Sequence, residues 1–325
     1  MSSVERATER RGGERLGNQP LPPVRSGRLS RKHVEIVVLL APALLLYIVF
    51  VLWPVVQSAH YSVYKWNGLE PLTHFVGLDN YREALNDQVF RDAVGHNIFF
   101  IAASLIFQLP LGLGLALMLN RKMVGRSALR LIVFAPYVLS EVTTGVAWLL
   151  MLNPDSFIDT VFRDLGMGGL VQGWISDPEF VRYTLFVVIT WKYIGFAVLL
   201  FLAGLQGIPT ELIEAARIDG ANGVQLTRRI MIPLLGPTIR IWIFLSVIGS
   251  LQLFDLIWVM TLGGPAGASS TMVTYLYERG FTRTQFGYGS AASVILFVCS
   301  FVFALLYQRF VLRRDTEGAI TRRVG

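Results

Sequence analysis

Six long apolar runs constrain this chain more strongly than any other feature of its sequence. They cover residues 34–56, 96–119, 128–152, 181–204, 238–262 and 287–311. A helix of about 20 residues crosses the roughly 30 Å hydrocarbon core of a bilayer, and each run reaches that length. Backbone polar groups find no water in hydrocarbon, so a spanning segment has to satisfy them internally as a helix. The sequence therefore predicts an all-α polytopic membrane protein with six transmembrane helices.

The composition agrees with a membrane protein and leaves little room for catalysis. Hydrophobic residues make up 53% of the 325 residues, and charged residues only 16%, beyond what a soluble domain of this length needs. The single cysteine, Cys299, lies in an apolar run and excludes a disulfide framework. The four histidines are not spaced as metal ligands, and no GxxxxGK(S/T) phosphate loop occurs. We expect no catalytic residues, no metal site and no cofactor bound by this chain.

Basic residues gather on one side of the predicted spans, and the net charge is +7. Those residues are Arg31, Lys32, Arg121, Lys122, Arg126, Arg130, Arg217, Arg228, Arg229, Arg309, Arg313 and Arg314. Cytoplasmic loops of membrane proteins are enriched in Lys and Arg, so both termini and the loop at 204–237 are expected in the cytoplasm. This placement favours a membrane surface, and no nucleic acid, as the partner of the positive charge.

The two ends of the chain are expected to be cytoplasmic tails. Residues 1–32 are rich in Arg, Gly, Ser and Pro without apolar periodicity, which predicts a disordered basic tail. Basic residues before an apolar run are also typical of a signal peptide. The run at 34–56, however, is longer than a signal's hydrophobic region and lacks a clear small-x-small cleavage site. We expect a membrane domain over residues 33–313 and a second tail at 314–325.

The loop at 204–237 is polar, lies between two spans, and predicts two short helices. Thr210 is placed to cap the first helix, and Gly220 stands where a glycine ends it. Asn222 can cap the second through a capping box with the residue three positions on. Pro233 marks where that helix bends or ends. The loop is thus a predicted cytoplasmic helix–turn–helix.

The same loop carries a specific resemblance to a known family. The triplet Glu214-Ala215-Ala216 is followed by Gly220 and then, after nine residues, by Ile230, with Pro233 three positions on. Further strings are FVGLDNY at 75–81, LNRK at 119–122, WKYIGF at 191–196 and LAGLQGIP at 202–209. Together they resemble the cytoplasmic EAA loop and its flanks in binding-protein-dependent ABC importer permeases, and EAARIDGA is similar to the maltose-type, carbohydrate branch.

The resemblance implies a transport subunit of the plasma or inner membrane that is not an enzyme. Such a permease translocates a di- or oligosaccharide delivered by an extracytoplasmic binding protein. A second homologous permease and a cytoplasmic ATPase dimer, which binds ATP and Mg, are its implied partners. The coupling residues toward the ATPase would be Glu214, Ala215, Ala216, Asp219, Gly220, Ile230 and Pro233. A solvated ion pair with Arg217 is the alternative interpretation of Glu214.

Polar groups inside the predicted spans indicate a passage, because such groups usually face a cavity or a partner in membrane proteins. By depth and residue type the candidates are Glu141, Trp191, Lys192, Ser246, Ser250, Gln252, Phe254 and Asp255. Carboxylates, amides, hydroxyls and aromatic rings suit a neutral sugar. The resemblance adds Gly195, Gly249 and Leu253 to the substrate path. The alternatives are that Glu141 pairs with Lys192 and that the aromatic residues contact lipid or neighbouring helices.

A self-sufficient, ion-coupled secondary transporter is the alternative function. Glu141, Lys192 or Asp255 would then relay protons or ions through the membrane. Such a transporter is typically built from an inverted repeat, which is not apparent here, and it gives no reason for the helix–turn–helix at 204–237. A membrane enzyme is disfavoured because no nucleophile–base pair or metal-ligand cluster occurs at membrane depth.

Overall fold

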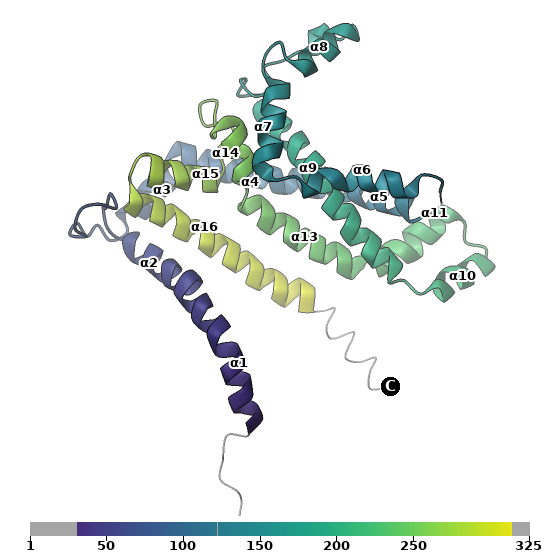
Figure 1. The fold of residues 1–325 in the computed structure, drawn as a ribbon, viewed down its shortest axis with the longest axis horizontal. Coiled ribbons are helices and arrows are strands. Elements are labelled where there is room, and N and C mark those ends of the chain that lie inside the picture. Colours follow the sequence, from purple (N-terminus) through teal and green to yellow (C-terminus); the bar gives the residue numbers. More distant parts are fainter. Residues whose placement is uncertain (1–30, 122, 314–325) are drawn as a thin grey trace, which may run out of the picture. The chain divides into compact units, whose positions relative to one another are not determined.

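The computed structural model describes residues 31–121 and 123–313, and every regular element in these ranges is a helix (Figure 1). An isolated β-bridge pairs Tyr64 with Phe75. The chain divides into two compact units, residues 1–54 and 55–325. The expected tails at 1–32 and 314–325 lie outside the described residues, except that Arg31 and Lys32 begin the first helix.

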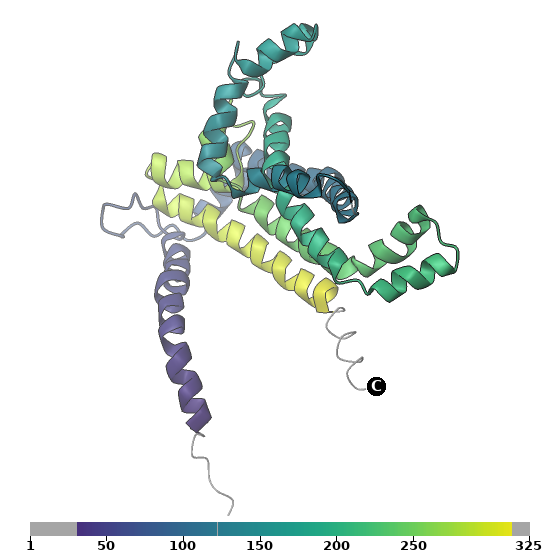
Figure 2. The same ribbon diagram turned by 45° about the vertical axis from the view of Figure 1, so that its right-hand side comes forward.

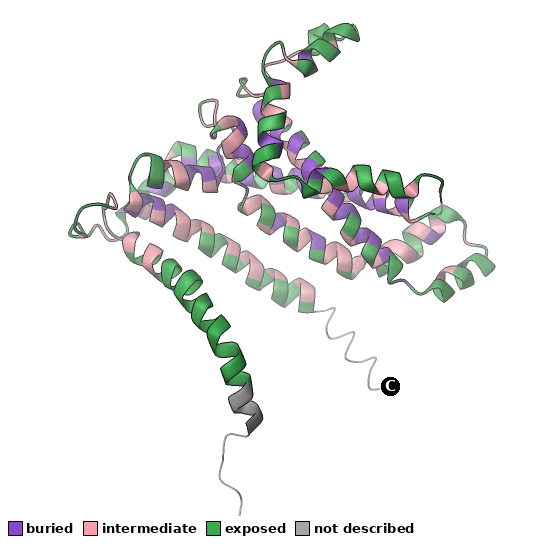
Figure 3. Ribbon diagram, in the orientation of Figure 1, coloured by how far each residue is buried: buried purple, intermediate pink, exposed green. Residues whose placement is uncertain are grey.

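The first unit contains α1 (Arg31–Tyr47) and π-helix η1 (Ile48–Leu52), and α2 (Trp53–Tyr61) continues the same helix into the second unit. Residues 36–61 are long and apolar enough to cross a membrane, and none of their apolar window is buried. Figure 3 shows α1 exposed along its described length. An apolar helix without buried residues suits lipid contact.

A π-helical turn precedes each of three prolines inside long helices. The pairs are η1 before Pro54, η2 (Ser104–Gln108) before Pro110, and η4 (Thr227–Met231) before Pro233. Proline has no N–H to donate and its ring crowds the preceding turn. The residue before each proline instead donates five positions back, as Trp53 N does to Ile48 O. The widened turn lets each helix continue through its proline.

The second unit contains the other candidate spans. They are α4 (Gln88–Ala103) with η2 and α5 (Leu109–Asn120), α9 (Val181–Gln206), and α16 (Phe286–Tyr307) with η6 (Gln308–Leu312). Two helix pairs also qualify but are bent: α6 (Arg126–Val138) with α7 (Glu141–Leu152) by 99°, and Gly223–Leu234 with α13 (Gly236–Leu251) by 64°. The described residues thus hold four candidate spans, or up to six if each bent pair counts as one.

Two of the predicted spans are not the continuous helices that the sequence suggested. The run at 128–152 breaks at Leu139 and Ser140, whose ψ angles of 149° and 150° are extended. Ser140 caps the new helix by accepting from Thr143 N, so the break is built into the sequence as an N-cap. The run at 238–262 breaks at residues 252–254, between α13 and α14 (Asp255–Thr261). The overall length and apolar character of each run suggested one continuous helix, although polar residues stand at both breaks, Ser140 and Glu141 at the first and Gln252 and Asp255 at the second.

The remaining helices are short. They are α3 (Asp79–Asn86), α8 (Phe157–Asp164), η3 (Gly168–Leu170), α10 (Thr210–Ile218), α11 (Gly223–Leu226), α12 (Ile232–Leu234), α15 (Met272–Tyr277) and η5 (Glu278–Thr282). Helices α7 and α14 pack against each other (Figure 1, Figure 2). Helices α10 and α11 project together at one end of the second unit.

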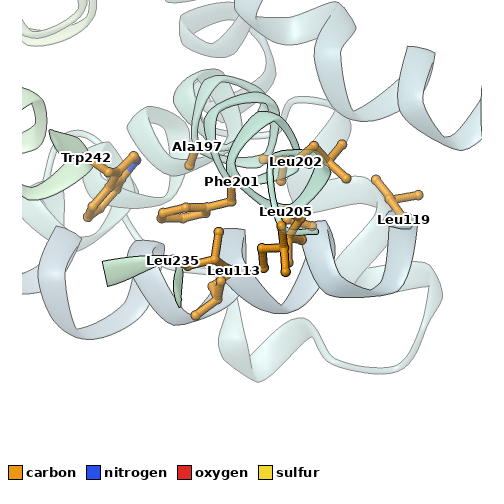
Figure 4. Packing of buried hydrophobic residues seen from close by; sticks show 11 residues of the cluster. Leu113, Leu119, Ala197, Phe201, Leu202, Leu205, Leu235 and Trp242 are labelled. Carbon is orange, nitrogen blue, oxygen red and sulfur yellow. The ribbon is translucent and has the colours of Figure 1, made fainter. Parts of the chain in front are cut away.

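The main core of the second unit forms around α9. Phe201 and Leu205 are buried there against Leu113, Leu235 and Trp242 (Figure 4). Helix α5 approaches closely because its contact residue is Gly112: a Cβ at that position would lie 2.9 Å from the Cβ of Ala197. Small residues allow such approach in lipid, where packing rather than water exclusion joins helices. Further buried clusters join α9 to α14, and α4 to α15 and α16.

Candidate functional site

A cavity of about 320 Å³ lies where the two broken segments, α6–α7 and α13–α14, meet α4, η2 and α9. It is lined by Phe100, Ser104, Gln108, Tyr137, Glu141, Phe186, Ile189, Tyr193, Phe196, Trp242, Leu245, Ser246, Gly249, Ser250, Gln252, Leu253, Phe254 and Asp255. Its wall is therefore mixed, with hydroxyls, amides and aromatic rings on a largely apolar background. The charged side chains in this lining are two carboxylates, Glu141 and Asp255.

The cavity brings together most of the substrate-path residues expected from the sequence. Glu141, Ser246, Gly249, Ser250, Gln252, Leu253, Phe254 and Asp255 all line it. Tyr137, Ser104 and Gln108 also line it but were missed. Ser104 donates to Gln108 Oε1 at 2.6 Å and bonds Ser246 at 2.8 Å, which ties η2 to α13. Ser104 and Gln108 could have been found from the sequence, because they are two polar residues one helical turn apart in an otherwise apolar run.

Two expected residues belong to helix packing instead. The Trp191 ring lies edge-on to Trp148 at 5.5 Å and does not line the cavity. Gly195 faces α6, where a Cβ would come within 2.5 Å of Val133 O and 3.1 Å of Phe134 Cα. Gly195 therefore allows α9 and α6 to touch, and a larger residue would force them apart.

Lys192 is buried behind the cavity wall, only 3% exposed. Its Nζ donates to Pro136 O at 3.1 Å, to Tyr137 O at 3.0 Å, and to Leu139 O. These carbonyls belong to the last turn of α6 and the break that follows it. The alternative interpretation, a direct pair between Lys192 and Glu141, is not what the structure shows, because all three ammonium donors face backbone carbonyls.

Glu141 has a different partner in the same place. It is the first residue of α7, and its carboxylate accepts a hydrogen bond from the hydroxyl of Tyr193. Tyr193 follows Lys192 on α9, so adjacent residues of one helix hold the two sides of the break. Both Glu141 and Tyr193 line the cavity. Tyr137 completes this wall, with its ring stacked on Phe196 at 5.3 Å.

The second break, at 252–254, is held by side chains that the sequence analysis did not single out. Asn97, 1% exposed, donates to Ser250 O at 2.6 Å and accepts from Met272 N at 2.9 Å. Thr271 donates to Leu253 O at 2.8 Å. Backbone groups released by a broken helix have to find partners at membrane depth. The position of Asn97 inside an apolar run is the one sequence feature that indicates a buried polar contact here.

The loop at 204–237 folds as two short helices, with one correction. Pro209, not Thr210, is the N-cap of α10, and it makes no side-chain cap because proline has no suitable oxygen. Gly220 follows α10 with φ +84°, a left-handed conformation that favours glycine. Asn222 and Gln225 form the expected capping box. The helix continues through Pro233 to Leu234 before it bends.

Most of the motif residues in this loop are accessible. Glu214, Ala215, Asp219, Gly220 and Pro233 are exposed, Ile230 is half-buried, and Ala216 is buried. Large apolar side chains stand beside them: Leu212 is 47%, Val224 75% and Ile218 86% exposed. Among the described residues no group of three His, Cys, Asp or Glu is placed to hold a metal ion.

Comparison with known proteins identifies the family. The model of the family described as binding-protein-dependent transport system inner membrane component matches residues 108–316. A probable ABC transporter permease of Pyrococcus horikoshii is 38% identical over 274 residues, covering 84% of this chain and 94% of the relative. The trehalose/maltose transport system permease of Thermococcus litoralis is 33% identical over 279 residues, covering 85% and 94%.

A solved structure supports the fold. The crystal structure of a bacterial ABC transporter involved in the import of the acidic polysaccharide alginate aligns with a TM-score of 0.77 and 23% identity, covering 87% of this chain and 96% of that one. The region matched by the family model, residues 108–316, includes both broken spans and the loop at 204–237. This chain belongs to the binding-protein-dependent transport system inner membrane components, the multi-pass permease subunits of ABC importers.

Proposed function

We propose that this permease translocates a neutral di- or oligosaccharide, and that the cavity between the broken spans is part of its path. The observation that carries the proposal is the chemistry of the lining. Serine hydroxyls and the Gln108 and Gln252 amides offer hydrogen bonds, and aromatic rings offer flat apolar faces. Sugars present hydroxyls at their edges and apolar faces to aromatic rings. The trehalose/maltose permease among the relatives has a name consistent with this substrate class.

Charge narrows the substrate class further. Glu141 and Asp255 are carboxylates, and the lining of this cavity includes no Lys, Arg or His. The nearby ammonium of Lys192 is buried, with its donors directed at carbonyls. A sugar carrying a carboxylate or phosphate would meet like charges without a counter-ion, and unpaired or like charges are an effective means of rejection. The preferred substrate is therefore uncharged.

The membrane arrangement is proposed as six spans over residues 33–313, with both termini and the loop at 204–237 in the cytoplasm. The distribution of Arg and Lys supports this orientation. Counting each bent pair as one span is consistent with the number six. The basic stretch 1–32 and the stretch 314–325 would then be cytoplasmic tails.

The loop at 204–237 is proposed as the contact with a cytoplasmic ATPase dimer, which binds ATP and Mg and drives transport. Exposed Leu212, Ile218 and Val224 give α10 and α11 an apolar surface that needs a cover. Glu214 and Asp219 add directional charge, and Ala215 permits close approach. Closure of the ATPases would move the spans as rigid bodies through this contact. A second homologous permease would complete the passage, and a binding protein would deliver the sugar.

The substrate proposal is tested by equilibrium binding to the complex purified through a tag on this chain, without a binding protein. Neutral disaccharides and trisaccharides are compared with uronic-acid oligosaccharides of matched length. We expect binding of a neutral sugar and none of the acidic series. The double variant Glu141→Gln, Asp255→Asn should lessen the discrimination. Stronger binding of the acidic series to the unmodified complex would contradict the proposal.

Energy coupling is tested in whole cells. Depleting ATP while the ion gradient persists should stop uptake if ATPases drive transport. Uptake that continues under ATP depletion and stops on collapse of the gradient would favour an ion-coupled secondary transporter, with Glu141 or Asp255 as the relay.

A further inference from the structure

The break between α6 and α7 leaves backbone carbonyls in need of partners. The last four carbonyls of a helix have no donor within that helix. Here Leu139 and Ser140 turn the chain by 99°, so no following helical turn covers the carbonyls of α6. At membrane depth such groups are costly to leave unpaired. This break, Leu139 and Ser140 with the adjoining ends of α6 and α7, is called the α6–α7 corner below.

The ammonium of Lys192 meets this need. It has three N–H donors, and it has three acceptors at the corner: Pro136 O at 3.1 Å, Tyr137 O at 3.0 Å, and Leu139 O. A positive charge is also favourable at the C-terminal end of a helix dipole. The side chain is 3% exposed and keeps no donor for a ligand in the cavity.

The neighbours of Lys192 on α9 act on the same corner. Tyr193 donates to the carboxylate of Glu141, the first residue after the break. Gly195 lets α9 touch α6, since a Cβ there would lie 2.5 Å from Val133 O. The corner therefore rests against one stretch of α9. It presents Tyr137 from its α6 side and Glu141 from its α7 side to the cavity.

We propose that Lys192 is a positioning residue: its buried ammonium holds the α6–α7 corner and thereby fixes Tyr137 and Glu141 in the cavity wall. A lysine within an apolar span usually suggests a contact with the transported molecule or a charge relay. This geometry assigns it to the backbone instead. The inference concerns the wall itself and is independent of which substrate the cavity accepts.

The angle of the corner can be measured directly. Spin labels are attached to Leu131→Cys on α6 and Leu150→Cys on α7, positions that are 70% and 64% exposed, after the single native cysteine is replaced by Cys299→Ser. Pulsed electron-spin resonance then gives the distance distribution between the labels in the full-length chain, purified in lipid nanodiscs without sugar. The distribution is compared among Lys192, Lys192→Arg, Lys192→Gln and Lys192→Met.

We expect one narrow distance peak with Lys192 and a similar one with Lys192→Arg, which keeps the charge and several donors. Lys192→Gln should broaden or shift the peak, and Lys192→Met should do so more. If Lys192→Met does not reach the membrane, the distance distributions of Lys192→Gln and Lys192→Arg still compare a neutral with a charged side chain at this position. A sugar-free distribution unchanged in both Lys192→Gln and Lys192→Met would overturn the proposal. Loss of sugar binding with such an unchanged corner would assign Lys192 to the substrate instead.

Discussion

Arg279 Nη2 lies 2.5 Å from Asp87 Oδ2, joining residues 192 positions apart in the sequence. The two side chains are 20% and 17% exposed. Tyr275 also donates to Asp87 Oδ2 at 2.7 Å, and Tyr275 in turn bonds the hydroxyl of Tyr288 at 2.6 Å. This cluster ties the start of α4 to α15, η5 and α16, outside the apolar stretch of α4.

The first prediction concerns this ion pair and its pH dependence. Burial raises the pKa of Asp87, but hydrogen bonds from Tyr275 and Val89 N together with the Arg279 charge outweigh it, so the pKa lies below its ordinary value. A carboxyl group whose pKa is lower in the folded than in the unfolded protein stabilises the fold at pH values above its unfolded pKa, which is about 3.9 for aspartate. That contribution is lost as the pH falls through the lowered pKa. Asp87→Asn should cost about 1–3 kcal/mol at neutral pH.

Thermal melting of the purified protein at neutral and acidic pH checks this. Asp87 also caps α4 by accepting from Val89 N at 2.8 Å, so Asp87→Ala should cost about 1 kcal/mol more than Asp87→Asn. The control is Asp79→Asn, whose ion pair with Arg82 is mostly exposed and should be worth under about 1 kcal/mol. Equal melting temperatures for Asp87→Asn and Asp79→Asn would contradict the prediction.

The second prediction concerns the turn between α10 and α11. A Cβ at Gly220 or at Gly223 would meet no atom within 4 Å, but only Gly220 has a positive φ, +84°. A side chain at Gly220 therefore meets no steric clash with other residues, but it strains the left-handed backbone. This strain should cost roughly 1–2 kcal/mol, and more for a β-branched residue. We expect Gly220→Val to lower both co-purification of the ATPase and stimulated ATP hydrolysis, while Gly223→Val stays near the unmodified protein. Full stimulation and co-purification with Gly220→Val would rule out this loop as the coupling element.

The third prediction concerns the buried amide that holds the 252–254 break. Asn97→Leu keeps the shape but leaves Ser250 O and Met272 N without partners, which should cost about 1–3 kcal/mol for each group. Thr144→Val is the matched control. Thr144 is 1% exposed, and its hydroxyl has no hydrogen-bond partner among the described residues, so its loss should be nearly neutral. The melting temperature should fall much further in Asn97→Leu than in Thr144→Val. Similar shifts in the two variants would show that Asn97 does not hold the break.

The sequence was most informative where the relevant interactions are local. The Asn222–Gln225 capping box and the left-handed Gly220 follow from residues three or fewer positions apart, and both are present. The polar residues between Ser246 and Asp255 stood out against their apolar neighbours, and Ser246, Ser250, Gln252 and Asp255 line the cavity.

Features that depend on distant partners were not predictable in the same way. The role of Lys192 depends on where α6 ends, and that end lies more than fifty residues earlier in the chain. The break at 252–254 depends on Asn97 and Thr271, which reach it from other helices. Thr210 was expected as a cap by residue type, but the backbone begins its helix one residue earlier, after Pro209.

The central claim is that the cavity between the broken spans conducts the substrate, and blocking it with a matched control is the most direct test. Gly249 lines the cavity, whereas Gly114 on α5 does not, and a Cβ at either position would meet no atom within 4 Å. Uptake of a labelled neutral oligosaccharide is measured in proteoliposomes containing the assembled, ATP-driven complex, with assembly checked by co-purification. We predict that Gly249→Trp assembles but abolishes uptake, while Gly114→Trp transports at close to the unmodified rate. Undiminished uptake by an assembled Gly249→Trp complex would contradict the account.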